Sequence, residues 1–154
     1  MVSEEQLTKI RDTIARFPQK RSAVLPVLHL VQEELGWLSP QAQDYVAELL
    51  GLPPIKVHEV ASFYTLFNKK PVGRYHLQVC TNIACMLRNS GEILQAIQKK
   101  LGIKPGETTA DQRFSVSTVE CLAACGGAPA MQVNSDYVEN LSTERLTAYL
   151  AELP

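Results

Sequence analysis

The chain has 154 residues, of which 45% are hydrophobic and 20% charged, and its formal net charge at pH 7 is −1. This composition suits one ordinary globular domain or two small ones, and it excludes disorder as the default expectation. The near-zero charge and the scattered basic residues argue against a nucleic-acid-binding surface. No apolar run reaches the roughly 20 residues of a membrane-spanning helix, and the N-terminus lacks the features of a signal or transit peptide. We therefore expect a soluble, intracellular protein.

The N-terminal part of the sequence predicts four successive helices. Ser3 and Gln6 resemble a capping box, and the helical apolar repeat that follows them lasts until Pro18. Glycines at 36 and 51 stand at the usual stop positions of two later helices. The three remaining helices are expected over 22–35, 40–51 and 54–67. Turn-forming residues from Asn68 to Gly73 then end the helical pattern, which predicts an N-terminal helical domain over 1–72.

After Gly73 the apolar pattern changes to the alternation typical of strands. One helix, capped by Ser90 and ended by Gly102, is expected between the first two strands, and Ser142 caps a final helix. The strands are expected over 75–80, 114–119, 131–133 and 137–138, the last two forming a hairpin. This order of elements is what a thioredoxin-like sheet with packed helices requires, which predicts a second domain over 73–154 and an α+β fold class.

The cysteines occur as two close pairs. Cys80 and Cys85 are spaced C-x4-C, Cys121 and Cys125 are spaced C-x3-C, and each pair follows a predicted strand directly. Loops that leave neighbouring strand ends can bring two thiolates each to one site. Four thiolates presented as two pairs suit a two-iron cluster, with two thiolates on each iron.

Three other interpretations of the cysteines remain open at this stage. Zinc also accepts four thiolates, although its structural knuckles usually use the tighter C-x2-C spacing. A thiol-disulfide redox pair is disfavoured because the usual C-x-x-C spacing is absent. Chance burial of free cysteines is disfavoured by the ordered placement of both pairs. The wider loops of this sequence favour iron.

The residues beside the cysteines extend these predictions. Several are small or polar, so backbone N–H groups could approach the sulfurs, although a simple tight loop would need the same residues. This set is Thr81, Asn82, Ala84, Ala123, Ala124, Gly126 and Gly127. A cis Ala128–Pro129 bond is a hypothesis that the sequence alone does not decide, since thioredoxin-like folds commonly hold a cis proline facing the redox loop. A second, apolar set forms either a collar that meets a partner or part of the local core: Ile83, Met86, Leu87 and Leu122.

The histidines are expected to be structural, because single-electron transfer needs no general base. The chain contains His29, His58 and His76. His76 precedes Cys80 on the same predicted strand, so it is the histidine for which a contact near the cysteines is conceivable.

Three motifs in the second domain carry a resemblance to a known family: C-T-N-I-A-C-M-L-R (80–88), G-I-K-P-G-E-T-T (102–109) and V-E-C-L-A-A-C-G-G-A-P (119–129). Segments 22–39 and 60–67 extend it over nearly the whole chain. The sequence resembles the NuoE family, the small iron-sulfur subunits of the NADH dehydrogenase module of respiratory complex I.

The resemblance implies a helical bundle followed by a thioredoxin-like [2Fe-2S] ferredoxin domain, with the cluster on Cys80, Cys85, Cys121 and Cys125. It also implies an oxidoreductase subunit that passes single electrons and docks on a NuoF-like partner holding FMN, NADH and a [4Fe-4S] cluster. Such a complex would keep the chain on the cytoplasmic face of the inner membrane without inserting it. The same family serves soluble NAD-linked formate dehydrogenases and hydrogenases, which is the alternative host.

The sequence contains no nucleotide-binding fingerprint. Its glycines do not fall as G-x-G-x-x-G, and no phosphate-binding P-loop occurs. We therefore expect NADH oxidation to belong to the partner, and no independent catalytic residue in this chain.

Overall fold

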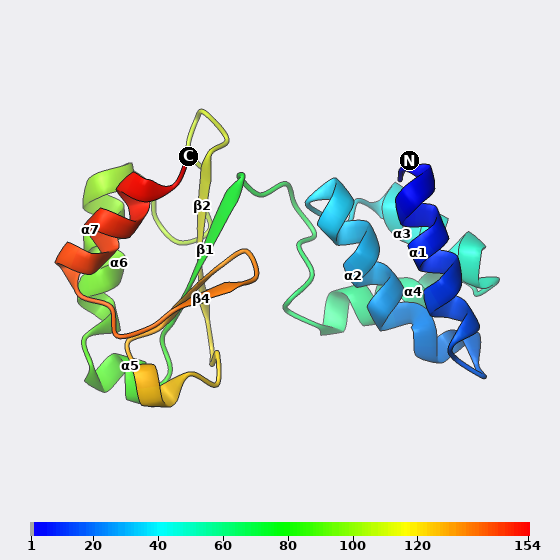
Figure 1. Cartoon of the computed structure of the whole chain (residues 1–154), viewed down its shortest axis with the longest axis horizontal. Coiled ribbons are helices and arrows are strands. Elements are labelled where there is room, and N and C mark those ends of the chain that lie inside the picture. Colours follow the sequence, from blue (N-terminus) through cyan, green and yellow to red (C-terminus); the bar gives the residue numbers. More distant parts are fainter. Residues whose placement is uncertain (1) are drawn as a thin grey trace. The chain divides into compact units, whose positions relative to one another are not determined.

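The computed structural model describes residues 2–154, and within them the chain folds into two units (Figure 1). One unit extends to Pro71 and consists of helices, and the other is Val72–Pro154, in which helices pack on a β-sheet. The predicted α+β fold class is confirmed. Within residues 2–154, none of the helices is both long and apolar enough to cross a membrane.

The helices of the first unit begin and end largely where local signals place them. Ser3 Oγ accepts a hydrogen bond from the backbone N–H of Gln6 (3.3 Å), and the left-handed Gly36 and Gly51 end the second and third α-helices. The capping box is only half formed, because the Gln6 side chain donates to the carbonyl of Leu30 (2.6 Å). The elements are α1 (Glu4–Ala15), a short 3-10 helix η1 (Lys20–Ala23), α2 (Val24–Leu35), α3 (Pro40–Leu50) and α4 (Pro54–Phe63).

The predicted extension of the fourth helix to Phe67 is wrong, because α4 ends at Phe63 and Tyr64 is extended. The cause is a side chain on another helix. Gln32 of α2 donates to the carbonyl of Leu66 (3.0 Å) and accepts from the backbone N–H of Asn68 (2.6 Å). These backbone groups are therefore satisfied without a continuing helix.

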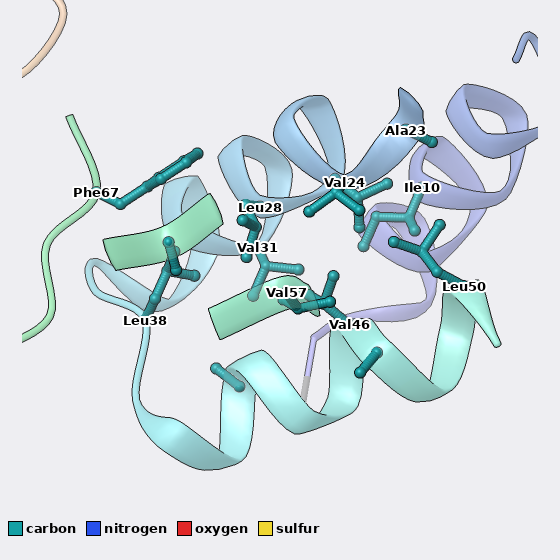
Figure 2. Packing of buried hydrophobic residues seen from close by; sticks show 14 residues of the cluster. Ile10, Ala23, Val24, Leu28, Val31, Leu38, Val46, Leu50, Val57 and Phe67 are labelled. Carbon is teal, nitrogen blue, oxygen red and sulfur yellow. The ribbon is translucent and has the colours of Figure 1, made fainter. Parts of the chain in front are cut away.

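One hydrophobic core joins all the α-helices of this unit (Figure 2). Ile10 of α1, Leu28 of α2, Val46 of α3 and Val57 of α4 are fully buried in it. Phe67, beyond the end of α4, covers the same core. Burying a side chain of this size contributes about 1.5–3 kcal/mol, so apolar packing accounts for the stability of this unit.

The second unit is built on a four-stranded mixed sheet of order β2-β1-β3-β4. β1 and β2 are parallel, β3 is antiparallel to β1, and β4 is antiparallel to β3. The parallel pair requires a crossover connection, and α6 supplies it. The elements are β1 (Tyr75–Cys80), α5 (Ile83–Leu87), α6 (Ser90–Leu101), β2 (Phe114–Val119), a short 3-10 helix η2 (Cys125–Gly127), β3 (Met131–Val133), β4 (Asp136–Val138) and α7 (Thr143–Glu152).

The core of the second unit lies between the sheet and two helices. Leu77 of β1, Ile97 of α6 and Leu146 of α7 are buried in one cluster. Figure 1 shows α6 and α7 along the sheet, with α5 and η2 at the end where β1 finishes. This end of the sheet is therefore the one that carries the cysteines.

Two local predictions for the second unit need correction. Ser90 is not the cap of α6; it is the buried first residue of the helix, and Asn89 precedes it in the left-handed conformation (φ 67°). Asn tolerates this conformation better than most residues do. The short helix α5, directly after β1, was not predicted from the sequence.

Candidate metal centre

The two cysteine pairs follow the carboxyl ends of two paired parallel strands, so both lie at the same end of the sheet. Cys80 is the last residue of β1 and pairs with Val119, the last residue of the parallel strand β2. The backbone N–H of Thr81 still donates to the Val119 carbonyl (3.0 Å), so the two chains part only beyond this point. Cys121 follows two residues later. The predicted arrangement, with both pairs at neighbouring strand ends, is present.

The four cysteines are free thiols that differ in exposure. Cys80 and Cys85 are buried, at 3% and 2% exposed, whereas Cys121 and Cys125 are exposed. Cys85 lies in α5 and Cys125 begins η2. The site therefore has an inner pair from the first loop and an outer pair from the second.

The two loops contact each other: Cys80 Sγ lies 3.9 Å from the carbonyl oxygen of Glu120, and Leu122 and Ala124 pack against the cluster that contains Cys80 and Cys85. The pKa of the Cys80 thiol is lowered: burial opposes this, but hydrogen bonds from the backbone of Asn82 and from Cys85 and Cys121 outweigh it. Burial raises the pKa of Cys85, and Cys80 and Cys125 add to the effect. Cys121, followed by burial and Cys80, raises the pKa of Cys125. Each loop thus has sulfurs within interaction range of the other.

Each thiol interacts with more than one other thiol. Within residues 2–154, however, no group of three or more His, Cys, Asp or Glu side chains is placed so that it could hold a metal ion as the side chains now lie. The contacts link Cys80 with Cys85, Cys121 with Cys125, and the two pairs with each other. The donor set is four thiols in two adjoining pairs, which is the set that a thiolate-held two-iron group needs.

Backbone amides approach the sulfurs, as the small residues of the loops predict. The N–H of Ala123 donates to Cys121 Sγ (3.3 Å), with Ala123 itself in the left-handed conformation (φ 57°). A backbone hydrogen bond from Ala130 also reaches Cys85. Backbone N–H groups in such positions can donate hydrogen bonds to the sulfur ligands of a bound metal group.

Small side chains pack beneath the site. Ala128 and Ala130 are buried together with Cys80 and Cys85, in a cluster distinct from the main core of this unit. The Ala128–Pro129 peptide bond is cis, which confirms the hypothesis from the sequence. Val119 and Leu122 pack against this cluster as partly buried residues, so Leu122 completes the local core while small side chains and thiols form its buried part.

The helix α5 presents an apolar surface beside the site. Asn82 Oδ1 accepts from the backbone N–H of Ile83 (2.7 Å) at its start. Cys85 faces inward, whereas Ile83, Met86 and Leu87 are 66%, 58% and 72% exposed. Sequence reasoning missed this helix because five residues are too few to show a period. Asn82, a favoured cap residue just after the strand, was the available signal.

The histidines have contacts of their own. His76 Nε2 lies 2.8 Å from Ser117 Oγ on the neighbouring strand, and burial lowers the pKa of His76. His58 bonds Gln43 and Ser62 in the first unit. His29 packs edge-on against the ring of Phe67. These contacts suit the structural roles expected of them.

A thioredoxin-like sheet with four thiols at one edge defines a class of small metal-binding electron carriers. The comparison with protein families gives the same answer. Residues 10–154 match the model of the thioredoxin-like [2Fe-2S] ferredoxin family. The chain belongs to this family, and the resemblance seen in the sequence is confirmed.

Relatives and solved structures agree with this assignment. The chain is 46% identical over 153 residues to the E subunit of NADH-quinone oxidoreductase from Rickettsia bellii (strain RML369-C), covering 97% of this chain and 92% of that protein. It is 48% identical over 142 residues to the corresponding E 2 subunit from Rhizobium meliloti (strain 1021), covering 92% and 84%. A crystal structure of an NAD+-reducing [NiFe]-hydrogenase in the H2-reduced state superposes with a TM-score of 0.74 at 26% identity. That match covers 85% of this chain and 22% of the hydrogenase chain.

Proposed function

We propose that this chain is a one-electron carrier that holds a [2Fe-2S] cluster on Cys80, Cys85, Cys121 and Cys125. The observation that supports this most directly is that the two pairs of free cysteines follow paired parallel strands at the same end of the sheet. When bound, such a cluster supplies reversible one-electron chemistry. The thiols would bind as thiolates, two to each iron.

The surroundings of the thiols suit this role. Cys80 and Cys85 would hold the inner side of the group away from water, because both are buried. The N–H of Ala123 would stabilise charge on Cys121, to which it already donates. Hydrogen bonds to cluster sulfurs are one of the levers that set a reduction potential. The backbone amides of the loops would therefore tune the electron carrier.

We propose NADH:quinone oxidoreductase as the host complex. The supporting relatives are named as E subunits of that enzyme, and this chain matches most of their length at 46–48% identity. Electrons would be exchanged with FMN on a NuoF-like subunit that also binds NADH and a [4Fe-4S] cluster. The chain would be peripheral on the cytoplasmic face of the inner membrane. The hydrogenase structure, at 26% identity, supports a soluble NAD-linked enzyme as the second candidate host.

The outer face of α5 is our candidate for contact with the flavin subunit. Ile83, Met86 and Leu87 are exposed apolar residues on the helix that carries the inner ligand Cys85. Burying them against a partner would exclude water beside the site. The chain would then need no catalytic residue of its own, because the hydride chemistry of NADH would take place on the partner.

We further propose that residues 1–72 and 73–154 act as separate domains. The division of the structure between Pro71 and Val72 supports a boundary here. Each side also has its own buried core. The N-terminal domain contains no cysteine, so we assign it a docking role rather than a redox role.

Substitution of one outer cysteine tests the ligand assignment. We expect Cys121→Ala, purified without oxygen, to lose most of its iron and acid-labile sulfide, because one iron would lack a ligand. Glu120→Gln is the matched control: it alters the exposed neighbouring side chain, keeps all four thiols and should retain the cluster. Iron and sulfide assays with the visible spectrum measure both. A full cluster in Cys121→Ala would contradict the assignment.

A further inference from the structure

The segment from Glu139 to Leu141 lies along the second cysteine loop. The backbone N–H of Asn140 donates to the Gly127 carbonyl (2.6 Å), and that of Leu141 donates to the Pro129 carbonyl (3.1 Å). Gly127 ends η2, the 3-10 helix that begins at Cys125. These two bonds hold residue 139 against the loop that carries the outer thiols.

The side chain of Glu139 lies directly against Gly127, in the space that a side chain at position 127 would occupy. A Cβ atom added at Gly127 would lie 2.6 Å from both Cβ and Cδ of Glu139, with the carboxylate oxygen Oε2 closer still. Cβ atoms in proteins essentially never approach other atoms so closely. At the adjacent Gly126 an added Cβ would meet open space. Glycine at 127 therefore leaves room for a carboxylate beside the loop, and its backbone has no positive φ that would explain it otherwise.

Glu139 is a half-buried residue, and its carboxylate forms no ion pair in the described part of the chain. The ion pairs within residues 2–154 are Lys9–Glu5 and Lys56–Glu59, both in the first unit. The nearest guanidinium in sequence, Arg145, donates to the backbone carbonyl of Asn140 (3.5 Å). The negative charge of Glu139 is therefore not neutralised by an ion pair, and partial burial reduces its screening by water.

We propose that Glu139 lowers the reduction potential of the cluster through its negative charge. The inference rests on the proposed function. A [2Fe-2S] group on four thiolates carries a net charge of −2 when oxidised and −3 after it accepts one electron from a donor such as reduced flavin. A carboxylate held against η2 repels the added negative charge and so disfavours the reduced state. Removal of this charge should favour the reduced state.

The test compares three variants of the full chain with the wild type, each loaded with its cluster without oxygen. Glu139→Gln removes the charge and keeps the shape, whereas Glu139→Asp keeps the charge. Glu152→Gln removes a charge from the end of α7. This end lies near the starts of β1 and β2, far from the strand ends that carry the cysteines. There Tyr75 donates to the carbonyl of Pro154, and Arg113 donates to that of Leu153. The readout is a redox titration followed by the paramagnetic signal of the reduced cluster.

At the wild-type midpoint potential, we expect Glu139→Gln to raise the ratio of reduced to oxidised cluster about tenfold, a positive shift of about 59 mV for a one-electron couple. Glu139→Asp and Glu152→Gln should stay within about twofold of the wild type. A ratio for Glu139→Gln within twofold of the wild type would overturn the inference. It would leave the proposed function intact, because the wild type would still show a reversible couple.

Loss of the cluster is also an informative result. Should Glu139→Gln not retain iron, Glu139→Ser replaces it as the neutral variant, and a raised midpoint potential there would support the inference. If both neutral variants lose iron while Glu139→Asp retains it, the carboxylate is needed for binding rather than for potential, and the inference is overturned. Wild-type protein that holds no iron would instead defeat the proposed function itself.

Discussion

The two units of this chain are stabilised in different ways. In the first, Leu28, Val46 and other large residues from all the α-helices fill one core. The second has such a core between its sheet and helices, but at the end that carries the thiols the buried cluster consists of Cys80, Cys85, Ala128 and Ala130. Small side chains bury little apolar area and so contribute little hydrophobic stabilisation. We therefore expect the first unit to be stable by packing alone, and the cysteine loops to depend on the cluster that we propose they bind.

Removal of iron should produce the largest difference between the two units in their rates of amide exchange. After anaerobic chelation we expect amide exchange in residues 119–130 to accelerate by several orders of magnitude, because metal binding and local folding are coupled. Exchange in α1–α4 should stay as slow as before. Hydrogen exchange followed by mass spectrometry measures both regions in one sample. Equal acceleration in the two units, or none in either, would contradict the view that only the cysteine loops depend on bound iron.

A core substitution in the first unit should lower the stability of that unit and leave the cysteine site unchanged. Leu28→Ala is expected to lower the free energy of unfolding of that unit by about 2–5 kcal/mol, because it leaves a cavity among fully buried neighbours. Iron content should not change. The exposed Leu87→Ala provides a control with an expected effect within about 0.5 kcal/mol. Urea unfolding followed by helical circular dichroism checks this, and loss of iron from Leu28→Ala would argue against independent units.

Substitutions at the two adjacent glycines of the second loop should have different effects on stability. Gly127→Ala should destabilise the second unit by about 1–3 kcal/mol, because the new Cβ collides with Glu139. Gly126→Ala should have an effect within about 0.5 kcal/mol, since its Cβ meets open space. Thermal unfolding of the two cluster-loaded variants is the measurement. Equal effects would mean that Glu139 moves aside easily.

Much of this structure could be predicted because its signals are local. Helical periodicity and the glycines at 36, 51 and 102 located most of the helices, and alternation located the strands. The cysteine site followed from two observations that needed no structure. Each pair comes directly after a predicted strand, and loops from neighbouring strands can converge on one site. The parallel pairing that ends at Cys80 and Val119 is seen only in the structure.

The features that were missed depend on contacts between distant residues or on very short elements. The end of α4 is set by Gln32, a side chain more than thirty residues away in the sequence. The position of Glu139 across Gly127 arises only when the sheet brings the two segments together. The helix α5 has five residues, too few for a hydrophobic period to be recognised.

We infer that four thiolates on two loops hold two bridged irons. Counts of metal and acid-labile sulfide in protein purified without oxygen, together with the visible spectrum, test this inference. We predict about two irons and two sulfides per chain and a reddish-brown colour that bleaches on reduction. A colourless protein with about one zinc per chain and no sulfide would contradict the account.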